Sequence, residues 1–262
     1  MPLSALHVAR TGLEAQDARM RVIANNLANI GTTGFKRDRA NFETLMYQDA
    51  RVAGQRSTAE TAYATGLNLG TGVAVQGTSR IETQGTLDTT GNVFDLALDG
   101  DGYFQITLPD GGTAYTRAGN FTLSAEGQLV TAQGFAVEPS ISVPQGAQSV
   151  TVAPDGTVTA MLAGEAEPTE LGQLTVARFT NAAGLQASGN NLLLETAASG
   201  PAEIGAAGAE GRGSIRQGML EASNVNVVEE MVAMIEAQRA YEINTKMISA
   251  VDEMLRNANQ AL

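Results

Sequence analysis

Apolar residues recur at intervals of seven near both ends of the chain. In residues 3–29 the repeat consists of Leu6, Leu13, Met20 and Leu27. In residues 227–257 it consists of Val227, Met234, Tyr241, Ile248 and Leu255. A seven-residue repeat draws one apolar stripe along a helix, and such a stripe needs a partner helix. The pattern therefore predicts two long terminal helices, paired as a coiled coil and able to contact further copies of the chain.

The residues at the ends of these helices agree with this prediction. Asn226 is a good N-cap for the second helix, and Glu229, three residues later, completes a capping-box pattern. The first helix is predicted to end in the run Asn25–Asn29, because Gly31 and Gly34 follow it and favour left-handed turn conformations.

The pattern changes to short apolar or alternating runs in the middle of the chain. Such runs occupy 73–75, 93–98, 103–108, 121–123, 150–152, 157–162, 174–179 and 192–194. The pairs Asp110-Gly111 and Asp155-Gly156 each lie between two runs, as tight hairpins require. Residues 73–198 are therefore predicted to form a mostly antiparallel β domain.

The connecting segments are less regular. Phe42, Leu45, Met46 and Tyr47 fit a short helix, whereas residues 50–65 are rich in Ala, Thr, Ser, Gln and Gly and fit an extended or weakly ordered arm. Residues 199–213 are rich in Gly and Ala and are interpreted as a return linker.

Together these patterns predict an α+β fold. Its expected parts are an inner coiled-coil assembly domain (1–34 and 222–262), a connecting and arm region (35–72 and 199–221) and an outer β domain (73–198).

Composition excludes several classes of function. The formal charge of −12 argues against a nucleic-acid partner, and the one tight basic cluster, Lys36, Arg37 and Arg39, is interpreted as a solvated face. No apolar run approaches the ~20 residues of a membrane helix, so membrane insertion is not expected. Arg10 and Glu14 interrupt any apolar stretch of a cleavable signal peptide.

Candidate catalytic and metal sites are weak. There is no cysteine, and His7 is the only histidine, so zinc and Ser-His-Asp sites are not expected. Asp99-Gly100-Asp101-Gly102 begins like a calcium loop, but Tyr103 and Phe104 then stand where an oxygen ligand and glycine are needed. No enzyme, cofactor or metal is predicted. Two classes stay open, a self-assembling structural protein and a carbohydrate-active or carbohydrate-binding β protein whose end helices dimerise.

Three motifs resemble bacterial flagellar rod and hook proteins. Residues 24–29 and 33–37 are similar to the N-terminal signature of that family, and residues 223–226, 234–235 and 238–244 to its C-terminal signature. Residues 100–104 and 115–121 are similar to its β domain. The motif positions singled out are Asn25, Asn26, Leu27, Asn29, Gly34, Phe35, Lys36, Asn224, Asn226, Gln238, Arg239 and Tyr241.

The resemblance implies a structural role. Chain length and the segment from about Tyr47 to Gly72 are most similar to the distal-rod branch, with proximal-rod and hook subunits as alternatives. Such proteins form a hollow helical tube that carries torque across the periplasm from motor to hook. The implied partners are copies of the chain, other rod subunits, the hook subunit, the P- and L-ring bushing proteins and the flagellar type III export apparatus. Export without a cleaved signal peptide to the basal body is also implied.

Overall fold

The computed structural model describes residues 2–51, 54, 56, 63–162 and 167–260. These residues form two compact units. Unit 1 comprises the described residues of Met1–Ala28, Asp38–Ser79 and Asn226–Leu262, and unit 2 comprises those of Asn29–Arg37 and Arg80–Val225. Helices occur at both ends and antiparallel strands between them, so the predicted α+β class is confirmed.

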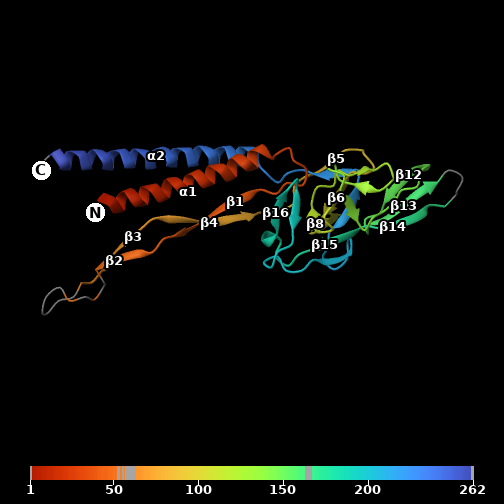
Figure 1. Ribbon diagram of the computed structural model, residues 1–262, viewed down its shortest axis with the longest axis horizontal. Helices are drawn as coiled ribbons and strands as arrows, with labels where there is room; N and C mark the ends of the chain where they lie inside the picture. The colour runs from red at the N-terminus through yellow and green to blue at the C-terminus, as the bar shows by residue number, and fades with distance from the viewer. Residues whose placement is uncertain (1, 52–53, 55, 57–62, 163–166, 261–262) are drawn as a thin grey trace. The chain divides into compact units, whose positions relative to one another are not determined.

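Unit 1 is built around two long antiparallel helices. Helix α1 spans Pro2–Ala28 and helix α2 spans Val227–Gln260, and Figure 1 shows them side by side. The Arg19 guanidinium lies 3.4 Å from the Glu236 carboxylate across the pair, and the partners of residues near either end of α1 follow the same antiparallel order. Both predicted helices are confirmed.

Small and polar side chains form the seam between the two helices. A Cβ atom on Gly12 would lie 3.1 Å from Nδ2 of Asn244. Near the other end of α1, Nδ2 of Asn26 donates to Oε2 of Glu230 at 3.3 Å. Ala237 is fully buried between these two points. Such small contacts let the helix backbones approach closely.

The predicted apolar stripes lie beside this seam. On α2 the seam positions are Glu230, Ala237, Asn244 and Val251, and the predicted stripe comes four residues after each. On α1 the stripe comes one residue after the seam positions Gly12, Arg19 and Asn26. Each residue turns the helix by about 100°, so in an antiparallel pair both offsets fall on the same side. The two stripes therefore line one partly exposed apolar face of the helix pair.

A β ribbon completes unit 1. Strand β1 (Asp38–Thr44) pairs with β4 (Val73–Arg80), and β2 (Tyr47–Arg51) pairs antiparallel with β3 (Leu67–Gly70). Gly72, at φ +125°, lies against α1, because a Cβ there would overlap Oγ1 of Thr11. The prediction of a short helix at residues 42–47 is wrong, since ladder partners far along the chain override the local apolar spacing. Residues 52–53, 55 and 57–62 of the expected arm lie outside the described part of the chain.

Unit 2 is almost entirely β structure. Its strands are β5 (Leu87–Thr89), β6 (Leu96–Asp99), β7 (Tyr103–Thr107), β8 (Thr113–Thr116), β9 (Thr122–Leu123), β10 (Leu129–Val130), β11 (Ala136–Glu138), β12 (Ala147–Val152), β13 (Thr157–Leu162), β14 (Thr169–Gln173), β15 (Thr175–Arg178), β16 (Gln186–Gly189), β17 (Leu192–Leu194), β18 (Glu203–Ala206), β19 (Ser214–Gln217) and β20 (Met219–Glu221). One 3-10 turn, η1, spans Ala182–Gly184.

The strands of unit 2 form four sheets within the described residues. The largest follows the order β16-β17-β8-β7-β11-β10-β9, with β15 joining β7 to β18. The others are β12-β13-β14, β19-β6 and β20-β5. Hairpins at Asp110-Gly111 and Asp155-Gly156 are confirmed, since they connect β7 to β8 and β12 to β13. The main core contains side chains such as Phe104, Phe121 and Ile215, each at most 1% exposed.

The chain divides differently from the predicted domain boundaries. Residues 199–213, interpreted as a linker, contain β18, which pairs with β15 inside the large sheet. Residues 73–79 belong with the helices, and residues 35–37 and 199–221 belong with the β domain. Local Gly and Ala content favoured a linker, but long-range strand pairing determines the observed arrangement.

Candidate functional site

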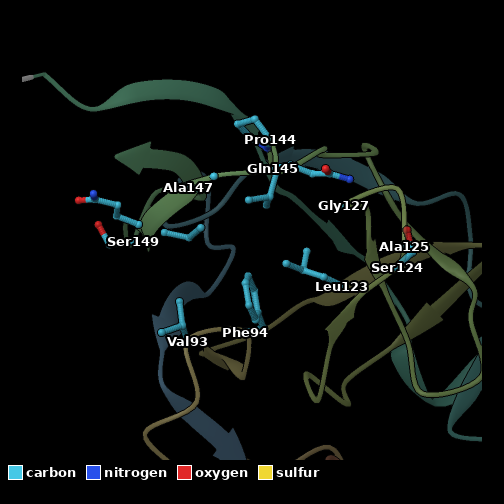
Figure 2. A pocket seen from close by; sticks show the side chains of 14 residues that line it. Val93, Phe94, Leu123, Ser124, Ala125, Gly127, Pro144, Gln145, Ala147 and Ser149 are labelled. Carbon is cyan, nitrogen blue, oxygen red and sulfur yellow. The ribbon is translucent and has the colours of Figure 1, made fainter. Parts of the chain in front are cut away.

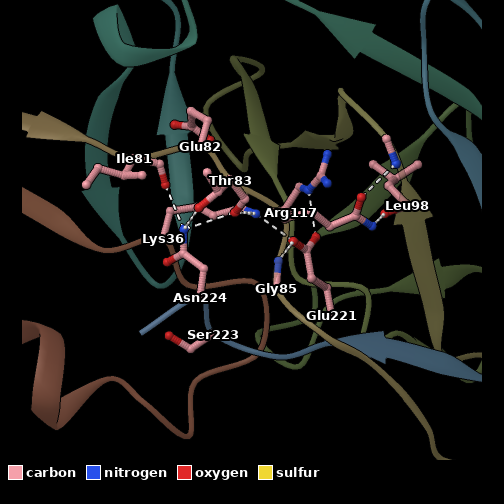
Figure 3. Close-up of polar contacts among 12 residues, drawn as sticks. Lys36, Ile81, Glu82, Thr83, Gly85, Leu98, Arg117, Glu221, Ser223 and Asn224 are labelled. Carbon is pink, nitrogen blue, oxygen red and sulfur yellow. Dashed lines mark hydrogen bonds and ion pairs between the residues drawn. The ribbon is translucent and has the colours of Figure 1, made fainter. Parts of the chain in front are cut away.

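Three buried charged side chains meet inside unit 2, and we call them the ion cluster: Lys36, Arg117 and Glu221 (Figure 3). Nζ of Lys36 lies 2.5 Å from one Glu221 carboxylate oxygen, and Nε of Arg117 lies 2.7 Å from the other. The Gly85 amide also donates to this carboxylate at 3.0 Å. The three side chains are 4%, 7% and 0% exposed, respectively. One carboxylate thus joins residues from both ends of the chain to the middle of unit 2.

The cluster shifts the proton affinity of its members. Burial alone would raise the pKa of Glu221, but the Arg117 charge and the hydrogen bonds from Lys36 and Gly85 outweigh it and hold that pKa below its usual value. Burial lowers the pKa of Lys36, and the contact with Glu221 offsets this only in part. Both cations also donate to carbonyl groups, Lys36 to that of Thr83 at 2.8 Å and Arg117 Nη1 to that of Gly102 at 2.6 Å.

Asn224 ties the same terminal segments together next to the cluster. Its Oδ1 accepts the Arg37 amide at 2.7 Å, while its Nδ2 donates to the carbonyls of Ile81 at 2.8 Å and Thr83 at 2.9 Å. Figure 3 shows Asn224 close to Lys36. The predicted solvated face at residues 36–39 is therefore wrong for Lys36, which is buried.

A second group of motif residues shapes the chain in unit 1. Nδ2 of Asn26 donates to the Asp38 carbonyl, and its Oδ1 accepts the Asp38 amide, both at 2.9 Å. Because Asn26 also donates to Glu230, it links α1, β1 and α2. Oδ1 of Asn226 accepts the Val228 amide at 3.0 Å, which confirms the predicted N-cap of α2.

Other motif residues shape the turn after α1 or lie on the surface of the helices. The Asn29 carbonyl accepts the Thr32 amide at 3.1 Å, and the Phe35 amide donates to the Thr32 carbonyl at 3.2 Å. Leu27 is half-buried. The exposed motif residues are Asn25, Asn226, Gln238, Arg239 and Tyr241.

Helix α2 also carries many exposed apolar side chains, which we call the outer face of α2. Val228 is 70% exposed and Ile243 61% exposed. Apart from the stripe residues Val227 and Tyr241, which are also exposed, the set is Val228, Met231, Val232, Ile235, Ile243, Met247 and Met254. Many exposed apolar side chains on one helix are typical of a protein interface.

A surface groove in unit 2 gives no sign of catalysis. Its volume is about 460 Å³, and Figure 2 shows Val93, Phe94 and Leu123 on one side with Pro144 and Ala147 on the other. All of its lining residues are uncharged. Within the described part of the chain, no three His, Asp or Glu side chains are grouped as metal ligands. Among the same residues, no helix is both long enough and apolar enough to span a bilayer.

Comparison with known proteins identifies the family. Three family models match in chain order: "Flagella basal body rod protein" at residues 6–36, "Flagellar hook protein FlgE/F/G D1 domain" at 97–160 and "Flagellar basal body rod FlgEFG protein C-terminal" at 216–261. The flagellar basal-body rod protein FlgG of Buchnera aphidicola subsp. Acyrthosiphon pisum is 48% identical over 98% of this chain and 99% of its own. The chain belongs to the FlgG family of flagellar basal-body rod proteins.

Two relatives from one organism separate the branches of the rod family. FlgG of Caulobacter vibrioides is 46% identical over 98% of this chain and 99% of its own, whereas FlgF of the same strain is 34% identical over 99% and 98%. The FlgG-family chain is therefore a structural subunit of the flagellar distal rod, and this assignment is favoured over the proximal-rod, hook and carbohydrate-binding alternatives. As a rod protein it belongs to the flagellar basal body.

Sequence reasoning missed two members of the ion cluster. Arg117 lies within the β-domain motif at residues 115–121, and Glu221 stands just before the C-terminal motif. Both Arg117 and Glu221 lie close in sequence to motif asparagines or glycines, and this could have marked them as candidate site residues. That they form an ion pair with each other is visible only in the structure. Lys36 and Asn224 were singled out by resemblance without a role, and the structure gives them one.

Proposed function

We propose that this FlgG-family chain assembles with copies of itself into a hollow helical tube that transmits torque from motor to hook. The single observation that carries the proposal is the outer face of α2, whose side chains find no cover in the isolated chain. A neighbouring copy is the partner that a rod subunit meets most often, so burial between copies accounts for this surface.

The partly exposed face formed by the two apolar stripes supports a second contact. Tyr241 and Val227 are each 39% exposed, and the rest of the stripe on α2 is half-buried against the pair. This face lies on a different side of α2 from Val228 and Ile235. Two apolar faces pointing in different directions allow each subunit to contact more than one neighbour, as an extended helical assembly requires.

Further partners follow from the role in the rod. We propose contacts with the other rod subunits, the hook subunit and the P- and L-ring bushing proteins, and passage through the flagellar type III export apparatus without cleavage of a signal peptide. The chain acts mechanically and catalyses no reaction in this role.

The experiment that tests self-assembly compares two changes on the same side of α2. Ile235→Asp places a carboxylate on the outer face, while Glu242 lies one heptad later and is already polar, so Glu242→Gln serves as the control. Purified protein is followed by sedimentation and negative-stain microscopy, and motility is scored in a strain lacking its own rod subunit. We expect tubes and motility for the parent and for Glu242→Gln, and neither for Ile235→Asp. Tubes formed normally by Ile235→Asp would refute the assigned surface.

A further inference from the structure

The last segment of unit 2, Glu203–Val225, supplies strands to three separate sheets. Strand β18 pairs with β15, β19 pairs with β6 and β20 pairs with β5. Strands β5 and β6 lie more than a hundred residues earlier in the chain, and in the described structure each has only this late partner. Unit 2 therefore begins and ends with strands that depend on each other.

The same segment fills the core and satisfies buried backbone groups. Ile215 is 1% exposed and packs in the main core. Nε2 of Gln217 donates to the carbonyls of Val93 and Val150, both at 3.0 Å, and its Oε1 accepts the Val152 amide at 3.1 Å. Gln217 thus connects β19 to β12 and to the loop before β6.

The ion cluster makes the dependence stronger. Glu221 is the only carboxylate that the described structure places against both Lys36 and Arg117. Without it, the hydrogen bonds left to these two almost fully buried cations go to the carbonyls of Thr83 and Gly102, and Glu82 remains only as a weaker electrostatic partner of Lys36. Buried cations without an anion are strongly unfavourable, so the arrangement around Lys36 and Arg117 cannot form early.

We infer that Glu203–Val225 is the closing element of unit 2, and that the β domain reaches its folded state only when this segment binds. A chain is synthesised from its N-terminus, so residues 29–202 emerge before the segment that completes them. The domain consequently stays unfolded until synthesis is nearly finished. The inference rests on the contacts of unit 2 and does not depend on the proposed self-assembly.

Native-state hydrogen exchange on the full-length protein tests this inference. Amides of β19 and β20 report on the segment, and amides of β7 and β8 report on the centre of the large sheet. In the parent protein we expect both groups to exchange through one global opening with the same denaturant dependence. Earlier exchange of β19 and β20, with β7 and β8 still protected, would overturn the inference, because the segment would then be a peripheral strap.

Variants sharpen the result. Glu221→Gln is expected to speed exchange by about a hundred-fold or more in β7 and β8 as well as in β19. Arg216→Ala is the control. Arg216 lies on β19, in the same closing segment as Glu221, but its pair with Asp99 is exposed, so a change below about ten-fold is expected. Gln217→Ala provides a milder second variant should Glu221→Gln fail to fold. Faster exchange in β19 alone, in either variant, would also contradict a closing role.

Discussion

Gly34 lies directly against the backbone of Arg117. A Cβ atom built on Gly34 would stand 2.7 Å from the carbonyl carbon of Arg117 and 2.8 Å from the Ala118 nitrogen. Gly34 also has φ +68°, which disfavours other residues. Its amide donates to the Glu221 carbonyl at 2.8 Å, so the close approach fixes the chain where it enters the ion cluster.

This contact predicts a severe effect of Gly34→Ala. The left-handed conformation alone costs about 1–2 kcal/mol for alanine, and displacement of the Arg117 backbone adds to it, so we expect the free energy of unfolding of unit 2 to fall by at least about 2 kcal/mol. Gly31→Ala is the control in the same turn, since no atom lies within 4 Å of its Cβ position. Urea unfolding followed by circular dichroism measures both. Equal stability of the two variants would show that Gly34 is not constrained.

The ion cluster predicts an order of effects. Glu221→Gln leaves two buried cations without a full counter-charge and is expected to lower the free energy of unfolding by about 3–5 kcal/mol. Lys36→Met should cost less, because Glu221 keeps Arg117 and the Gly85 amide as partners. Chemical denaturation of the three proteins measures the order. A larger loss for Lys36→Met than for Glu221→Gln would contradict the central role of the carboxylate.

The lowered pKa of Glu221 predicts acid sensitivity. The unfolded chain takes up this proton near the ordinary value of 4.5, while the folded protein does so only at lower pH. The stabilisation is therefore complete above pH 4.5 and is lost as pH falls through the folded pKa.

The measurement is the free energy of unfolding between pH 6 and about pH 2.5. We expect Glu221→Gln to flatten the decline below pH 4.5. Asp155→Asn is a useful comparison, because the Asp155 carboxylate is fully exposed and its pKa is lowered by hydrogen bonds with Thr157. An unchanged slope in Glu221→Gln would mean that this carboxylate is not the acid-sensitive group.

Much of the fold was predictable from local pattern. The helices, the Asn226 cap and the two Asp-Gly hairpins depend on spacing and turn residues that lie close together in sequence. The strands at residues 38–51 and 203–206 were not predictable in this way. Their ladder partners lie elsewhere in the chain, and pairing overrode an apolar helical spacing at Phe42 and a Gly-rich composition near Ile204.

The seam of the helix pair shows a similar limit. A heptad of Leu, Met and Ile attracts attention because large apolar residues favour a coiled-coil core. The structure instead places Gly12 against Asn244 and Asn26 against Glu230, and leaves the large side chains beside them. Two helix backbones can approach closely only where the residues between them are small. A repeat of large apolar residues therefore does not reveal where the backbones meet. The proposal that the stripe residues contact other subunits stays a prediction.

Ile248 tests whether the stripes serve assembly. It is half-buried beside the seam, so Ile248→Asp places a carboxylate between α1 and the expected neighbour. We expect this change to prevent tube formation, since an unpaired buried carboxylate costs on the order of several kcal/mol in every subunit. The β domain should retain its melting transition, because Ile248 belongs to unit 1. Motility or normal tubes in the variant would show that Ile248 does not lie in an interface between subunits.

The β2–β3 ribbon is the candidate for rod stiffness. Tyr47 is 57% exposed, Leu67 46% and Leu69 41%, and Met46 beside them is 85% exposed. A two-stranded ribbon is only marginally stable alone, so we expect an adjacent subunit to cover these side chains. Deleting residues 50–65 takes away Ala50 and Arg51 of β2, so it should weaken the ribbon and that tie between subunits while leaving the helix pair able to assemble. We expect tubes that form but curve, measured as persistence length in electron micrographs.

A variant with residues 50–65 replaced by a Gly-Ser stretch of equal length controls for spacing, and its tubes should also curve. If the tubes of both variants are as straight as those of the parent, residues 50–65 do not contribute to the rigidity of the rod.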